Sequence, residues 1–208
     1  MLIGAGVLLV WAVAGGVGAQ PAELSTVRGE AQETSFGDAT AEALCADANT
    51  VIGLAPAVSF KAGTIPGVGA TRAQVAGLLQ TPEDPWAVSR LTGAQIRAAL
   101  ERSLSRVPLP SNAFLQVSGL TVTYDASKAR EHRLISVTTA EGPLQPDQQY
   151  EVVMPLYLAT GQAGYFQVFG KDDIIRQGTT ALADAVFQYL QHNPNKSYTG
   201  QGRIVAGG

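Results

Sequence analysis

The first 20 residues carry no charged side chain, and this feature constrains the chain more than any other. The run Leu2 to Ala19 is almost wholly apolar. Because Val17-Gly18-Ala19 offers small residues where a signal peptidase cuts, residues 1–19 are predicted to be a signal peptide. An uncleaved membrane anchor is the main alternative, since about 20 apolar residues can cross a bilayer, and a buried helix is a third. The first two predict an exported protein, periplasmic, secreted or anchored at the cell surface.

The composition of the chain excludes several classes of partner and cofactor. Lys and Arg number 14 against 17 Asp and Glu, and no basic block is present, so a nucleic-acid partner is not expected. The single Cys45 excludes an internal disulfide and is expected to be a small buried side chain. The only histidines, His132 and His192, lie far apart, which argues against a His-rich two-metal site. No metal and no other cofactor is predicted.

Residues 20–32 are polar and predict a linker, which leaves residues 33–208 for the folded domain. Four segments have helical spacing of their apolar residues: one capped by Thr34, one over 71–80, one opened by a Thr92–Gln95 capping box, and one capped by Thr179 or Thr180. Strands are predicted over 50–54, 86–91, 114–124, 134–139, 150–158 and 174–175, with a loop over 55–70. Because strands and helices alternate irregularly, the sequence predicts an α/β (α+β) fold with a mixed sheet.

Five short motifs, taken together in this order and spacing, resemble the C-terminal domain of the 5′-nucleotidase family. They are residues 91–96 (LTGAQI), 114–120 (FLQVSGL), 123–125 (TYD), 144–150 (LQPDQQY) and 158–165 (LATGQAGY). The resemblance covers roughly residues 33–193 and implies a compact α/β domain, a mixed sheet with flanking helices, that normally follows a dimetal phosphoesterase domain. Two-metal hydrolysis depends on ligands of that other domain. The resemblance therefore implies no catalytic residue and no metal ligand in this chain.

The resemblance also implies that several nucleotide-binding residues of the family are replaced. The family's Asn-Gly-Gly-Gly-Ile-Arg run falls on residues 52–57, so its Asn becomes Ile52 and its Arg becomes Ala57. The sugar-binding Asp becomes Ala163, and the Pro-Phe-Gly-Asn run falls on residues 81–84, which end in Glu83 and Asp84. Two carboxylates there are expected to repel a phosphate group.

The aromatic pair that sandwiches the base in the family falls on Phe114 and Tyr157. Such rings could still stack a flat ligand, although both could instead be ordinary core aromatics. Gln116 is a candidate for hydrogen bonding a base edge, with a solvent-facing strand residue as the alternative. Gln162, in the loop that carries Ala163, completes the predicted ligand-binding residues.

These observations lead to one functional hypothesis with two rivals. The chain is expected to be an exported, noncatalytic 5′-nucleotidase C-terminal-like domain that acts as a binding or accessory module for a nucleoside-like ligand. Alternatively, it is the substrate-binding half of a split 5′-nucleotidase, completed by a separate metallophosphoesterase chain. A remnant that binds no ligand is the third interpretation.

Overall fold

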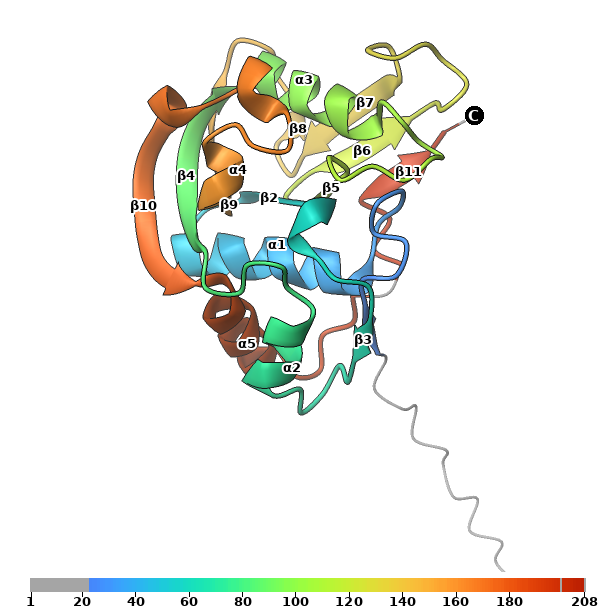
Figure 1. The fold of residues 1–208 in the computed structure, drawn as a ribbon. Coiled ribbons are helices and arrows are strands. Elements are labelled where there is room, and N and C mark those ends of the chain that lie inside the picture. Colours follow the sequence, from blue (N-terminus) through green and yellow to red (C-terminus); the bar gives the residue numbers. More distant parts are fainter. Residues whose placement is uncertain (1–22, 199, 208) are drawn as a thin grey trace, which may run out of the picture.

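The computed structural model describes residues 23–198 and 200–207 and centres on a five-stranded sheet (Figure 1). Its strand order is β10-β4-β9-β2-β5. Strands β2 and β9 run parallel, and the other neighbouring pairs run antiparallel, so the predicted mixed sheet is confirmed. The five strands are β2 (Ile52–Pro56), β4 (Pro85–Thr92), β5 (Leu115–Ser118), β9 (Gln149–Pro155) and β10 (Ile174–Ala181).

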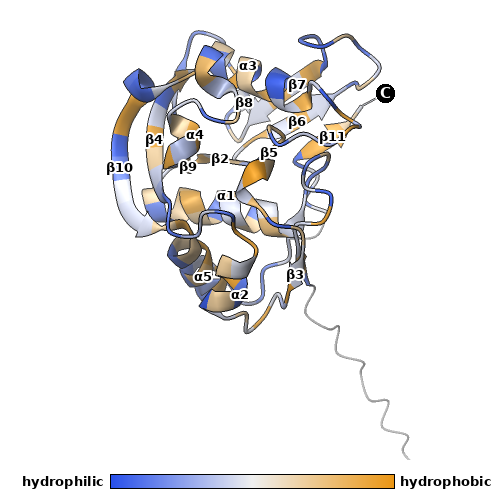
Figure 2. Cartoon of the chain, viewed as in Figure 1, coloured by the Kyte–Doolittle hydropathy of each residue, from blue (hydrophilic) through white to orange (hydrophobic). Residues whose placement is uncertain are grey.

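Helices and a second sheet cover the two faces of this sheet and enclose two apolar cores (Figure 2). One core lies between the sheet and three helices, α1 (Ser35–Ala48), α2 (Arg72–Gly77) and α5 (Leu182–His192). The other lies beneath α3 (Gly93–Leu104) and a four-stranded sheet of order β11-β6-β7-β8. That sheet comprises β6 (Thr121–Tyr124), β7 (Leu134–Thr139), β8 (Gly142–Pro143) and the C-terminal β11 (Ile204–Ala206).

Local capping signals in the sequence set the helix starts as expected. The Thr34 hydroxyl accepts the Gly37 N–H at the start of α1, and Thr92 forms the predicted capping box with Gln95 before α3. Because these side chains satisfy N–H groups that lack a helical partner, they fix where each helix begins. Cys45 is buried on α1, as predicted.

The fold begins earlier than the sequence predicts, so the linker interpretation is wrong for residues 24–32. Strand β1 (Leu24–Ser25) pairs with β3 (Thr64–Ile65), and Leu24 lies in the core beneath α1. The Thr26 hydroxyl donates to the carbonyl of Lys61 at 2.7 Å. Polar composition misled the prediction because this segment is held mainly by hydrogen bonds to its backbone and small hydroxyls.

Five predicted elements differ in the structure. The predicted strand 150–158 ends at Pro155 and continues as the short helix α4 (Leu156–Ala159), and strand 114–124 is two strands separated by the turn at Gly119. The predicted two-residue strand at 174–175 is the eight-residue β10. Thr179 and Thr180 lie inside β10, so neither caps α5, whose N-cap is Ala181. The predicted loop 55–70 contains the 3-10 turn η1 (Ala57–Ser59) and β3.

No helix among residues 23–198 and 200–207 is long and apolar enough to cross a membrane. The predicted signal peptide or anchor, residues 1–19, lies outside the residues that the structure describes.

Candidate functional site

Three segments meet where the parallel strands β2 and β9 end, and we call this place the carboxyl edge. They are residues 57–59 after β2, residues 156–159 after β9, and residues 81–84 before β4. The register places them together, because Trp86 of β4 pairs with Pro155 of β9. Ligands of open α/β sheets commonly bind outside the carboxyl ends of the strands. The carboxyl edge is therefore the candidate site.

Tyr157 is the central side chain of the carboxyl edge. Its ring is half-buried against the core, and its phenol oxygen lies 2.6 Å from the hydroxyl oxygen of Ser59, which is itself buried. Burial raises the pKa of Tyr157 above its usual value, so the phenol stays protonated at physiological pH. Tyr157 therefore offers a ring and a neutral hydroxyl to a ligand.

A single carboxylate, that of Asp84, carries the unpaired negative charge at this edge. It accepts the backbone N–H of Tyr157 at 3.3 Å. Partial burial raises the pKa of Asp84, and that hydrogen bond opposes the shift. The other expected carboxylate, Glu83, forms an ion pair with Arg72 at 3.1 Å, and this guanidinium, which also pairs with Asp184, offsets part of its charge. Repulsion of a phosphate group therefore rests mainly on Asp84.

Phe114 lies beside the carboxyl edge but faces the interior. Its side chain has no exposed surface and belongs to the core beneath α3. Its carbonyl accepts the N–H of Ala57 at 2.7 Å. Within the described residues, Phe114 and Tyr157 make no ring-to-ring contact, whereas Tyr165 and Phe169 stack with centroids 5.3 Å apart. The structure does not bring the predicted aromatic pair together as a slot.

Gln116 is fully buried and holds the chain that leads into α1. Its side-chain oxygen accepts the N–H of Thr34 at 2.8 Å, and its amide nitrogen donates to the carbonyls of Gly29 and Gln32 at 3.1 and 2.9 Å. The alternative of a solvent-facing strand residue is wrong. These hydrogen bonds occupy the amide within the domain, so the structure gives no support for contact with a base.

Gln162 is exposed and lies next to Tyr157, since its backbone N–H donates to the Tyr157 carbonyl at 3.3 Å. The following Ala163 has a φ of 53°, in the left-handed region. Of the four predicted ligand-binding residues, the structure therefore brings Tyr157 and Gln162 together at the surface, while Phe114 and Gln116 lie inside.

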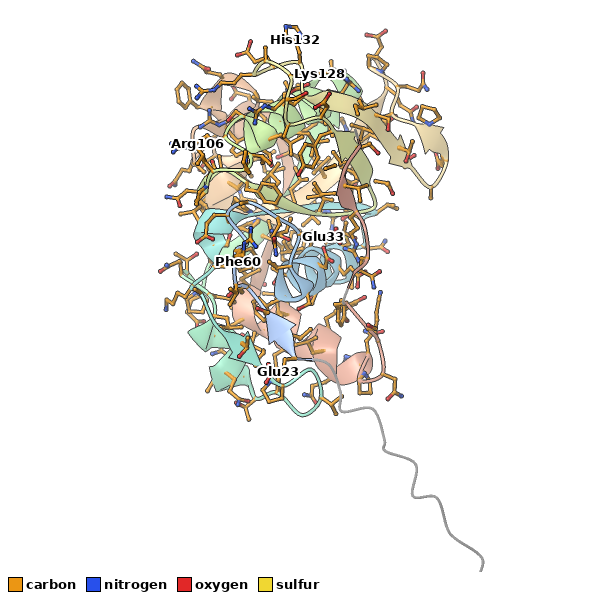
Figure 3. The ribbon with its side chains drawn as sticks, turned by 90° about the vertical axis from the view of Figure 1, so that its right-hand side faces the viewer. Glu23, Glu33, Phe60, Arg106, Lys128 and His132 are labelled. Carbon is orange, nitrogen blue, oxygen red and sulfur yellow. The ribbon has the colours of Figure 1, made fainter. Side chains whose placement is uncertain are left out.

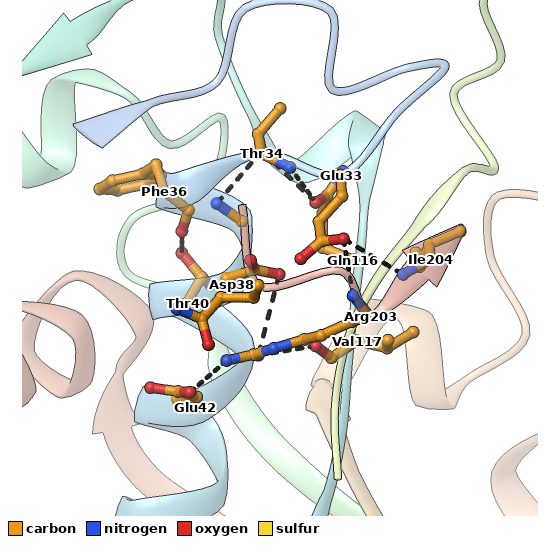
Figure 4. A network of polar contacts seen from close by, with 12 residues as sticks. Glu33, Thr34, Phe36, Asp38, Thr40, Glu42, Gln116, Val117, Arg203 and Ile204 are labelled. Carbon is orange, nitrogen blue, oxygen red and sulfur yellow. Dashed lines mark hydrogen bonds and ion pairs between the residues drawn. The ribbon is translucent and has the colours of Figure 1, made fainter. Parts of the chain in front are cut away.

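A second polar cluster, away from the carboxyl edge, surrounds Arg203 of the C-terminal segment (Figure 4). Its guanidinium contacts the Glu42 carboxylate and donates to the Val117 carbonyl at 2.9 Å. Asp38 lies 3.8 Å from the same guanidinium, and Glu33 accepts the backbone N–H of Arg203 at 2.8 Å. The cluster fastens the C-terminal segment across α1, and no pattern in the sequence indicated it.

Within the described ranges, no group of three or more His, Cys, Asp or Glu side chains is arranged to hold a metal ion. His132 lies in an exposed loop and His192 at the exposed end of α5. Sequence reasoning missed Ser59, because a serine in a Gly- and Pro-rich loop has no distinctive spacing.

Comparison with known proteins identifies the family. The family model described as the C-terminal domain of 5′-nucleotidase matches residues 13–171. The chain belongs to the 5′-nucleotidase C-terminal domain family. It is 32% identical over 124 residues to the snake venom 5′-nucleotidase of Naja atra, which covers 56% of this chain. It is 30% identical over 95 residues to the human 5′-nucleotidase, covering 42% of this chain.

The domain fold is shared with a solved nucleotidase structure. The 5′-nucleotidase precursor of Thermus thermophilus superposes with a TM-score of 0.78 and 25% identity over 89% of this chain. The match covers 38% of that protein, and the Naja atra and human matches cover 23% and 16% of those enzymes. The chain therefore spans less than half the length of each of these relatives.

Proposed function

We propose that this 5′-nucleotidase C-terminal domain is a noncatalytic binding module that takes an uncharged, flat ligand of the nucleoside class at its carboxyl edge. The observation that carries the proposal is the pairing of a half-buried Tyr157 ring with the Asp84 carboxylate that accepts its N–H. A ring can stack on a base, whereas an unpaired carboxylate repels a phosphate group. The loss of the family's Asn and Arg at Ile52 and Ala57 agrees with this preference.

Calorimetric titration with adenosine and with adenosine monophosphate tests the proposal. Adenosine should bind weakly and at least as well as its monophosphate. Tyr157→Phe keeps the ring and should retain adenosine binding, whereas Tyr157→Ala should abolish it, because stacking contributes about 1 to 3 kcal/mol. Tyr150→Ala is a matched control, since Tyr150 is also partly buried but lies at the opposite end of β9.

Three results contradict the proposal. A clear preference for the monophosphate that Tyr157→Ala removes would show that the carboxyl edge retains a phosphate site. Equal loss of adenosine binding in Tyr157→Ala and Tyr150→Ala would attribute the effect to stability rather than to contact. Absence of binding by both ligands would favour the interpretation of a remnant without a ligand.

The same proposal predicts that the chain alone hydrolyses no phosphate ester. Purified protein supplied with Mg²⁺, Mn²⁺, Zn²⁺ or Co²⁺ and a nucleoside monophosphate should release no phosphate above buffer, because two-metal hydrolysis needs a cluster of ligands. Metal-dependent activity that copurifies with the chain through several columns would overturn this part.

A second candidate function is the substrate-binding half of a split 5′-nucleotidase. In the Thermus thermophilus 5′-nucleotidase precursor, the region that matches this domain is 38% of a longer chain. A separate metallophosphoesterase chain would then supply catalysis. Co-expression with a metallophosphoesterase encoded by a neighbouring gene should yield a stable complex with nucleotidase activity that neither chain shows alone, and failure to associate would exclude that pairing.

Export belongs to the proposal as well, and rests on the charge-free run of residues 1–20. Mass spectrometry of the native protein should find Gln20 or a residue close to it at the N-terminus. Recovery of the intact chain from the cytosolic fraction would argue against export.

A further inference from the structure

A cavity of about 540 Å³ lies between α3 and two loops, residues 125–133 and 164–168. Its size falls within the usual range for small-ligand pockets. It shares no lining residue with the Tyr157, Ser59 and Asp84 group of the carboxyl edge. Its polar lining consists of Glu101, Arg102, Ser105, Arg130, Glu131 and Gln167.

Arg102 is held rigidly in the wall of this cavity. Its Nη2 donates to the carbonyl of Ala163 at 2.8 Å, and its guanidinium lies 5.4 Å from the centre of the Tyr165 ring. A Cβ on Gly164, whose φ is 79°, would come within 1.8 Å of Nη2, so only glycine leaves room for the guanidinium there. The local sequence thus places a preorganised cation in the cavity wall.

The charge of Arg102 has no carboxylate partner. Among the described residues, no Asp or Glu oxygen lies within ion-pair distance of its guanidinium, and its Nε is buried without an acceptor. Withdrawing a charge from water without an opposite charge is costly. An anion in the cavity would offset this cost.

A second cation lines the same cavity, and the surrounding corner of the molecule is basic. Arg130 is exposed and makes no hydrogen bond or ion pair with any residue that the structure describes. Arg106, Lys128 and His132 lie toward the same end (Figure 3). Residues 93–106 and 125–133 together carry six Lys and Arg against three Asp and Glu, on a chain of net charge −3. This corner therefore attracts anions.

The two carboxylates of the lining differ in whether their oxygens are free to accept a hydrogen bond from a ligand. Glu101 accepts the backbone N–H groups of Arg133 and Leu134 at 3.0 and 2.9 Å, so its charge is offset within the protein. Glu131 is exposed in the loop and remains an acceptor. A ligand that fits this lining has oxyanion groups for the two arginines and a hydroxyl that donates to Glu131.

We propose that this cavity is a binding site for a small hydroxylated oxyanion, with Arg102 and Arg130 as the residues that bind its negative groups. Hydroxy polycarboxylates and sugar phosphates share this chemistry. Titration with citrate and with ribose 5-phosphate distinguishes the two sources, and ribose is the neutral control. At least one anion should bind, with chemical-shift changes at the amides of α3 and of residues 164–168, while ribose should not.

Two variants that each remove one positive charge distinguish binding inside the cavity from attraction by the overall charge of this corner. Arg130→Ala should weaken binding by at least about fivefold, which corresponds to about 1 kcal/mol. Arg106→Ala removes a nearby cation outside the lining and should weaken binding less than about twofold at physiological salt, because exposed charges are screened over a Debye length. Both variants change exposed side chains and should keep the wild-type melting temperature.

The proposal is overturned if neither anion binds, or if the shift changes map to the carboxyl edge instead. It is also overturned if Arg106→Ala weakens binding as much as Arg130→Ala, since the effect would then be one of overall charge. These outcomes are independent of adenosine binding at Tyr157, so the two proposals can fail separately.

Discussion

Replacing Asp38 with Asn should make the stability of the domain less sensitive to pH. Asp38 is 1% exposed on α1. Burial, with the nearby Glu33 and Glu42 carboxylates, raises the pKa of Asp38 to about 9, while the charge of Arg203 opposes the shift. The carboxyl group is therefore protonated in the folded protein at neutral pH and ionised in the unfolded chain.

The sign of the effect follows from proton linkage. Between pH 3.8, the ordinary pKa, and about 9, the folded state binds one more proton at Asp38 than the unfolded state does. The stabilisation of the fold by protonated Asp38 is therefore complete below pH 3.8. As pH rises above that value, this stabilisation is lost by at most about 1.4 kcal/mol per pH unit. From pH 6 to pH 8 the wild-type protein should lose up to about 3 kcal/mol of stability through this group.

Urea unfolding at pH 6, 7 and 8 measures this loss. The substituted carboxamide cannot ionise, so the free energy of unfolding of Asp38→Asn minus that of wild type should rise steadily with pH. Contributions from other titrating groups largely cancel in this difference. Parallel curves for the two proteins over this range would refute the reasoning and show that Arg203 keeps Asp38 ionised in the fold.

Three further predictions test other parts of the structure. Gln116→Leu should lower the free energy of unfolding, measured by chemical denaturation, by about 3 kcal/mol. The reason is that it leaves the Thr34 N–H and two carbonyls without a partner. Thr92→Ala should cost about 1 kcal/mol by removing the cap of α3; a change below the error of the same assay would contradict the capping argument. Asp84→Asn should improve binding of adenosine monophosphate relative to adenosine by about fivefold, and an unchanged ratio in calorimetry would place the phosphate away from this carboxylate.

The sequence was sufficient for the parts of the fold that depend on local signals. The caps at Thr34 and Thr92, the alternating strand 134–139 and the apolar stripe of α3 all have a short-range physical cause, and each occurs in the structure. The irregular alternation of strands and helices predicted the mixed sheet, and the family resemblance added the helices on its faces.

Contacts between distant segments were not predictable in this way. In the sequence, Gln116 is simply one polar residue in a predicted strand. In the structure, its hydrogen bonds reach residues more than 80 positions away. Phe114 was assigned to a ligand slot from motif position, but whether a ring at a strand start faces the core or the surface depends on the register with β2. The burial of Asp38 depends on Arg203, which returns from the far end of the chain.

The distribution of positive charge connects the two candidate sites. At the carboxyl edge the family's Arg position is Ala57, and Arg72 of α2 is engaged by Glu83 and by Asp184 at 2.6 Å. Across α3, by contrast, Arg102 and Arg130 have no carboxylate partner within the described residues. At the carboxyl edge, a nucleoside monophosphate therefore meets the Tyr157 ring but no free cation for its phosphate. At the cavity beside α3 it meets two arginines, but no exposed stacking ring among the lining residues. If the monophosphate also enters the cavity, the amides of α3 and residues 164–168 should shift in addition to those of the carboxyl edge, whereas adenosine should shift only those of the carboxyl edge.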